Sequence, residues 1–139
     1  MATTDIEQRR EAIRKALAQR EGQPPDASRV AEVTLGLWRQ VTAQLSPVIG
    51  AHGVDVLFVR ALHLTSKAFP WIAVAGEQGN SVALLAGLKA RLADREAEIA
   101  AEASYTLVVT FTELLETLIG ETLTERLLGP VWAPPGAPD

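Results

Sequence analysis

The chain contains 139 residues, of which 47% are hydrophobic, carries a net charge of −4 and has no cysteine. Its length suits one domain with a single core, and its hydrophobic content excludes a generally disordered chain. The mild negative charge argues against a nucleic-acid partner, and the lack of cysteine excludes disulfides, thiol catalysis and thiolate metal sites. We therefore predict one domain over residues 1–132, followed by a disordered tail over residues 133–139.

The first predicted helix covers residues 4–20 and begins with a capping box formed by Thr4 and Glu7. Gly22 and the two prolines that follow it end this helix. Its apolar stripe is thin and consists of Ile6, Ile13, Ala16 and Leu17. Because so few apolar residues face one way, we expect the helix to dock loosely on its own chain or to pack on a partner chain.

Two helices are predicted over residues 26–45 and 54–68. Between them, Ser46-Pro47 is typical of a new helix start, and Gly50 and Gly53 favour a tight turn. The apolar face of the first helix consists of Val30, Val33, Leu37, Val41 and Leu45, with Trp38 beside it. The apolar face of the second consists of Val54, Leu57, Phe58, Ala61, Leu62 and Thr65, and its polar side carries Val56, Arg60, His63 and Lys67.

The C-terminal half predicts a helix that begins at Asn80 or Ser81 and then a long central helix near residues 95–119. The helix that begins at Asn80 or Ser81 is predicted to bury Leu85, Leu88 and Leu92. The central helix is predicted to bury Ala103, Leu107, Phe111, Leu114 and Leu118. The helical period continues through residues 105–111, although β-branched and aromatic residues are frequent there. We therefore predict helix and not strand for this stretch.

A short last helix is predicted over residues 122–128, with a capping box at Thr122–Glu125 and a stop at Gly129-Pro130. Together these patterns predict an all-α fold: a single-domain bundle of five or six helices around the long central helix. The bundle is the usual architecture for helices that each have one apolar face.

His63 is the first candidate site residue, because it shares a helix face with Arg60 and Lys67. An exposed imidazole between cations can accept a phosphoryl group and hold it. The run 61–67 resembles the histidine phosphotransfer family, whose motif has lysine three residues after the histidine, followed by glycine. Here Lys67 follows His63 by four residues and the glycine is missing. The resemblance implies a phosphorelay role for His63; a solvated polar helix face is the alternative.

Acidic side chains on the central helix form a second candidate site. Four polar residues align along one side of this helix: Glu102, Thr106, Glu113 and Glu116. Paired carboxylates can perform acid–base chemistry or bind a metal, but the Glu-x-x-His motif of di-iron bundles is absent. The alternatives are a solvated face, or ion pairs with Arg60 and Lys67 within the bundle or across a dimer. We expect no metal and no cofactor.

Aromatic residues suggest a third candidate. A cavity lined by Trp38, Phe58 and Phe111 would suit a sensor of hydrophobic small molecules, whereas aromatic residues at helical spacing also suit an ordinary core.

A protein-interaction surface is the fourth candidate. The apolar residues Trp71 and Ile72 follow a proline and precede a glycine-rich loop, so we predict a contact patch there. Glu113 and Glu116 are the predicted polar interaction residues.

The sequence has no phosphate-binding loop, dinucleotide fingerprint, nucleophile elbow or metalloprotease motif. Its longest run without charge, residues 40–54, is shorter than the roughly 20 apolar residues that span a bilayer. We therefore predict a non-enzymatic interaction or signalling module of the bacterial cytosol, without a membrane or nucleic-acid partner. We expect it to act as an adaptor or regulator, through a protein partner or as a homodimer.

Overall fold

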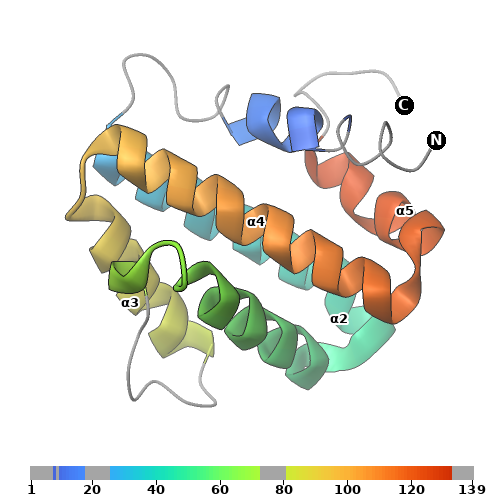
Figure 1. The fold of residues 1–139 in the computed structure, drawn as a ribbon. Coiled ribbons are helices and arrows are strands. Elements are labelled where there is room, and N and C mark those ends of the chain that lie inside the picture. The colour runs from blue at the N-terminus through green and yellow to red at the C-terminus, as the bar shows by residue number, and fades with distance from the viewer. Residues whose placement is uncertain (1–7, 9, 18–25, 73–80, 133–139) are drawn as a thin grey trace.

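The computed structural model describes residues 8, 10–17, 26–72 and 81–132, and this part of the chain is helical without strands. A helical segment over residues 10–17 precedes the remaining elements (Figure 1). These are α2 (Ala27–Thr65), the short 3-10 helix η1 (Pro70–Ile72), α3 (Ser81–Ala93), α4 (Ala97–Ile119) and α5 (Glu121–Trp132). The all-α bundle predicted from the sequence is confirmed. The predicted tail over residues 133–139 lies outside the described residues.

The bundle is organised around α4 and the first part of α2, which run in the same direction (Figure 1). Their facing residues show this direction, because Thr34 contacts Ser104 and, further along both helices, Trp38 contacts Phe111. Every fourth or third residue of α4 is buried, so the stretch around Phe111 is helical as predicted. The predicted inward position of Leu118 is wrong: it is 60% exposed, and Leu115 takes the last buried place.

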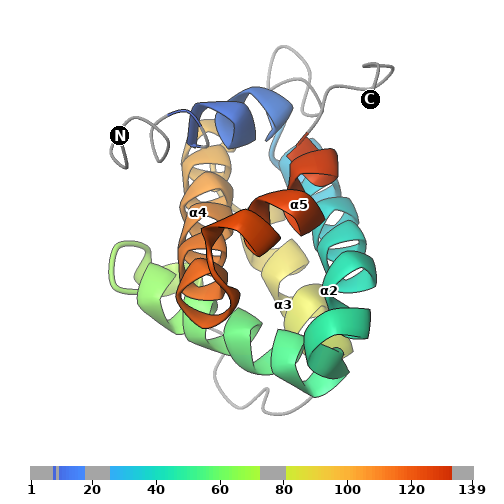
Figure 2. The same ribbon diagram turned by 90° about the vertical axis from the view of Figure 1, so that its right-hand side faces the viewer.

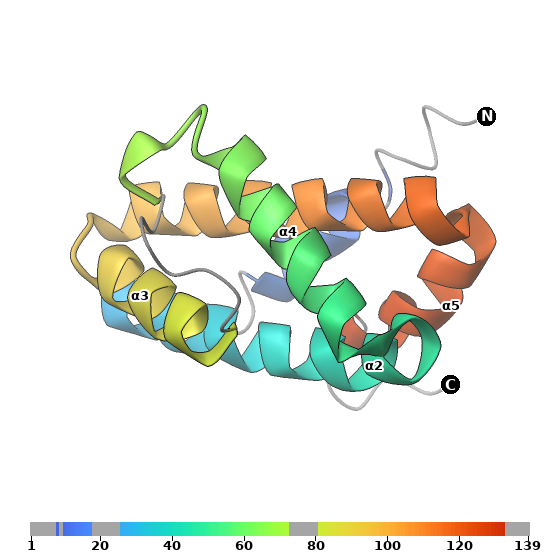
Figure 3. The ribbon, with the colours of Figure 1, turned by 90° about the horizontal axis from the view of Figure 1, so that it is seen from below.

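Between residues 45 and 54, the helix extends past its predicted end at Leu45, and the predicted turn lies at Gly50. Helix α2 runs through Ser46 and Pro47 and bends at Gly50, which has non-helical dihedral angles of φ 82° and ψ 154°. Pro47 removes one backbone donor but leaves the neighbouring residues helical, because proline itself fits helical φ. The bend divides α2 into a first arm, residues 27–49, and a second arm, residues 51–65, as Figure 3 shows.

Gly120 forms a second bend of the same kind, with φ 91° and ψ 158°, and α4 ends just before it at Ile119, the predicted end of the central helix. Helix α5 then begins at Glu121 and not at the predicted capping box. The Thr124 hydroxyl donates to the Gly120 carbonyl at 2.7 Å, so it bonds backward along the helix. The predicted stop at Pro130 is also wrong, because α5 continues to Trp132 and holds Pro130 within its last turn.

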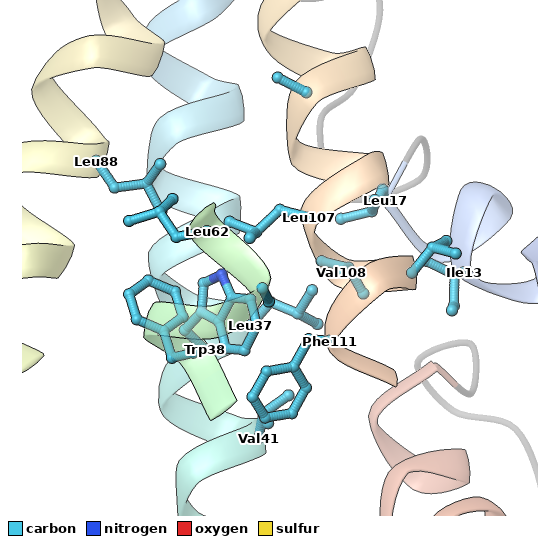
Figure 4. Packing of buried hydrophobic residues seen from close by; sticks show 14 of the residues in the cluster. Ile13, Leu17, Leu37, Trp38, Val41, Leu62, Leu88, Leu107, Val108 and Phe111 are labelled. Atoms are coloured by element: carbon cyan, nitrogen blue, oxygen red, sulfur yellow. The ribbon is translucent and has the colours of Figure 1, made fainter. Parts of the chain in front are cut away.

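The core lies between α4, both arms of α2 and the helices that cover them (Figure 4). It includes most of the predicted faces of α2, against which Val33 and Leu57 pack partly buried, together with Leu88 and Leu92 of α3 and Leu128 of α5. Ile13, Ala16 and Leu17 of the N-terminal segment are also buried in it, at 1%, 5% and 4% exposure. The described part of the N-terminal helix therefore packs on its own chain.

Candidate functional site

The aromatic residues predicted to line a cavity pack directly against one another. The ring centre of Trp38 lies 4.8 Å from that of Phe58 and 4.7 Å from that of Phe111, both in edge-to-face geometry. These distances are typical of touching aromatic rings, and none of the three side chains is more than 3% exposed. The rings occupy the space that a ligand between them would need, which argues against the predicted cavity at this place.

Two hydrogen-bonding groups in this core have no hydrogen-bond partner among the residues that the structure describes: the indole N–H of Trp38 and the hydroxyl of Thr65. Burying such a group without a partner lowers stability. The buried pair Thr34 and Ser104 behaves differently. The Thr34 hydroxyl donates to the Val30 carbonyl at 2.8 Å, so the 2.7 Å contact with Ser104 requires the Ser104 hydroxyl to donate to Thr34. This bond links α2 to α4 across the core.

His63 and Arg60 are exposed on the outer side of the second arm of α2, as predicted, whereas Lys67 is exposed in the turn that follows the end of the helix at Thr65. His63 lies in the last turn of that helix. The backbone carbonyl of His63 accepts a hydrogen bond from the Ser66 hydroxyl at 2.6 Å. The imidazole is accessible, but no described side chain fixes its orientation.

Among the described residues, Glu102 and Glu113 of α4 contact the N-terminal segment and not Arg60 or Lys67, so the alternative of ion pairs with these two cations within the bundle is wrong. Arg10 binds Glu113 at 2.5 Å, and Arg14 lies 3.4 Å from Glu102. The Arg14 guanidinium carbon also lies 3.9 Å from the centre of the Tyr105 ring.

These surroundings have opposing effects on Arg14. Burial lowers the pKa of Arg14, but the hydrogen bond and charge of Glu102, with a smaller contribution from Tyr105, raise it to a net value above the ordinary one. Arg14 therefore stays charged at any neutral or moderately alkaline pH. A basic group whose pKa is higher in the folded than in the unfolded chain stabilises the fold at every pH below its unfolded-state pKa. The contribution of Arg14 to stability is therefore constant over the neutral and moderately alkaline range.

The predicted contact patch around Trp71 is only partly on the surface. Ile72 has no exposed surface, because η1 turns it into the core, and this part of the prediction is wrong. Trp71 is partly buried; its ring lies against Phe69 at 6.1 Å and under the Arg95 guanidinium at 4.8 Å. Arg91 also donates to the Trp71 carbonyl at 3.4 Å. Internal contacts therefore engage much of this side chain.

Exposed aliphatic residues give a different surface, which the sequence analysis did not identify as a site. Val56 and Val59 on the second arm are 53% and 43% exposed, and Val48 just before the bend is 46% exposed. The position of Val56 on the polar side of its helix was the available signal. We call the exposed side of the second arm that carries Val56, Val59, Arg60 and His63 the outer face of α2.

By length and composition, α2 is the one helix among the described residues that could cross a membrane, and 28% of its most apolar 18-residue stretch is buried. Core helices of other proteins pass the same test. The described residues contain no cluster of three or more histidine, aspartate or glutamate side chains that could hold a metal ion. Comparison of the chain with protein-family models, curated proteins and solved structures gives no match.

Proposed function

We propose that the chain is a non-enzymatic interaction module that self-associates through the outer face of α2. The observation that carries this proposal is the exposure of Val56 and Val59, three residues apart on one helix. Residues at this spacing lie side by side on a helix surface. Adjacent exposed aliphatic residues are typical of surfaces that a partner covers.

A second copy of the chain is the partner that fits this face best. Closed two-fold dimers are the commonest oligomers, and in them the same surface meets itself. An antiparallel pairing of two second arms would place Val56 of one copy against Val59 of the other. The positive charge of the outer face lies toward its C-terminal end, at Arg60. Antiparallel pairing keeps these ends apart, whereas parallel pairing would bring like charges together.

Sedimentation of the full chain tests this proposal, and Val56→Glu is the informative variant. A glutamate at the centre of the apolar contact would bury a charge without a partner in the dimer. We therefore expect the unmodified chain to sediment as a dimer and the variant as a monomer. The measurement should cover about 1 to 100 µM, the range of weak association. Because Val56 is half exposed, the free energy of unfolding of the variant should differ from that of the unmodified chain by no more than about 0.5 kcal/mol.

Ile99→Glu is the matched control, because Ile99 is another branched aliphatic residue with 42% exposure, but lies in the first turn of α4. We expect this variant to sediment like the unmodified chain. A monomeric unmodified chain at the highest concentration, or equal dissociation by both variants, would refute self-association through the outer face of α2.

A further inference from the structure

The outer face of α2 carries both histidines of the chain. The second arm of α2 lies at the edge of the bundle opposite the N-terminal segment 10–17 (Figures 1 and 2), and no described helix covers its outward side in Figure 3. The sequence contains two histidines, His52 and His63, and both are exposed on this arm. They extend the row formed by Val56 and Val59, because the four residues follow one another at spacings of four, three and four. Residues at these spacings form one stripe along a helix.

The two histidines are placed symmetrically about the two valines. The midpoint between positions 52 and 63 coincides with the midpoint between positions 56 and 59. The two-fold axis of the antiparallel pairing passes through this midpoint, so it places His52 of one copy beside His63 of the other, once on each side of the valines. Within one copy the two histidines lie 11 residues apart, about 16 Å along the helix axis, and are too distant to share one ion. Only a second copy brings them together.

A carboxylate adjoins each of these histidine pairs. Asp55 is half-buried and follows His52 by three residues, so the two are neighbours on the helix. Arg60, three residues before His63, is the neighbouring cation, and the Asp55 carboxylate offsets its charge. Two imidazoles and a carboxylate are a ligand set that zinc takes in proteins, with water in the fourth position. The described residues of one copy bring no three such side chains together, so the set is complete only across the dimer.

We propose that His52 and Asp55 of one copy and His63 of a second copy bind a zinc ion, so that two equivalent zinc sites flank the valine contact of the dimer. This inference rests on the proposed self-association through the outer face of α2 and names the ligand that regulates it. Packed helices have axes about 8–10 Å apart, and histidine nitrogens bind zinc at about 2 Å, so two facing imidazoles can reach one ion. A ligand that binds the dimer and not the monomer shifts the equilibrium toward the dimer.

Sedimentation of the full chain in excess Zn²⁺ and in a metal chelator is the first measurement. We expect Zn²⁺ to lower the dissociation constant of the dimer at least about tenfold relative to the chelator. Mg²⁺ should have no effect, because it prefers oxygen ligands in an octahedral arrangement. His52→Ala and His63→Ala should each lose the response to Zn²⁺. Both side chains are exposed, so neither substitution should disturb the fold.

A mixture of the two variants tests whether the ligands come from different copies. In a mixed dimer, the His63→Ala copy supplies His52 and Asp55, and the His52→Ala copy supplies His63, so one complete zinc site returns. In a dimer of either variant alone, both sites lack a histidine. We therefore expect Zn²⁺ to promote association in the mixture and in neither variant alone.

The outcomes separate this inference from the self-association on which it rests. If the unmodified chain is a dimer in chelator and Zn²⁺ leaves its dissociation constant unchanged, the zinc sites are refuted and the self-association stands. If Zn²⁺ strengthens association but the mixture responds no better than the separate variants, the ligands do not come from two copies and the inference fails. A monomer both with and without Zn²⁺ refutes the self-association and the zinc sites together.

Discussion

Replacing Trp38 by alanine should lower the free energy of unfolding by about 3–5 kcal/mol, the largest effect that we expect from any single substitution. Trp38 is 2% exposed and contacts both Phe58 and Phe111, so the smaller side chain loses two aromatic contacts and leaves a cavity between α2 and α4. Urea unfolding followed by far-ultraviolet circular dichroism measures this change. It does not depend on the fluorescence of the residue that is removed.

Trp38→Phe is the matched control, because it keeps an aromatic ring and removes an indole N–H that no described residue accepts a hydrogen bond from. Removing this donor breaks no hydrogen bond and relieves the cost of burying it unpaired. This gain in stability offsets part of the loss that the smaller side chain causes. We expect a loss below about 1.5 kcal/mol, as for substitutions that nearly preserve volume. A loss as large as that of Trp38→Ala would show that the indole N–H makes an essential interaction, against the packing described above.

Gly50→Ala and Gly120→Ala should each lower the free energy of unfolding by about 1–3 kcal/mol through backbone strain. Both glycines have φ near +90° and ψ near +155°, a region open essentially only to glycine. An added Cβ at either position would meet no atom within 4 Å, so the cost comes from the backbone and not from a clash. Alanine at position 50 should also straighten α2 or disorder its bend.

Gly36→Ala separates this effect from a general intolerance of substitution at glycine. Gly36 lies within the regular part of α2, and an added Cβ there also meets no atom within 4 Å. We expect this variant to be more stable by about 0.5–1 kcal/mol, because alanine favours the helix. Destabilisation of all three variants to a similar degree would contradict the assignment of bends to Gly50 and Gly120.

The sequence predicted the buried faces well, because every apolar stripe that packs on α4 repeats at helical spacing. It predicted the helix ends less well where proline or glycine was present. Pro47 and Pro130 both lie within helices, since proline lacks one donor but has helical φ, and the single glycines Gly50 and Gly120 make the actual bends. A turn signal indicates where a helix can end, and packing of the flanking residues decides whether it does.

The surfaces were harder to predict than the core. The sequence indicated an acidic side on α4, but the pairing of its glutamates with Arg10 and Arg14 depends on where the N-terminal segment docks. Helical spacing cannot show which of two basic segments reaches a distant helix. Ile72 was predicted at the surface because its neighbours form a break, yet η1 buries it completely.

A single engineered thiol tests the central proposal of self-association most directly, because the natural chain has no cysteine. Under mild oxidation, Val56→Cys should form a covalent dimer, because the two-fold axis of the antiparallel pairing passes between positions 56 and 59 and brings each residue 56 within about one helical turn of its own copy. Ile99→Cys, at a similarly exposed position in α4, should remain monomeric under the same conditions. Equal yields of covalent dimer from both variants, or no dimer from Val56→Cys, would contradict an interface on the outer face of α2.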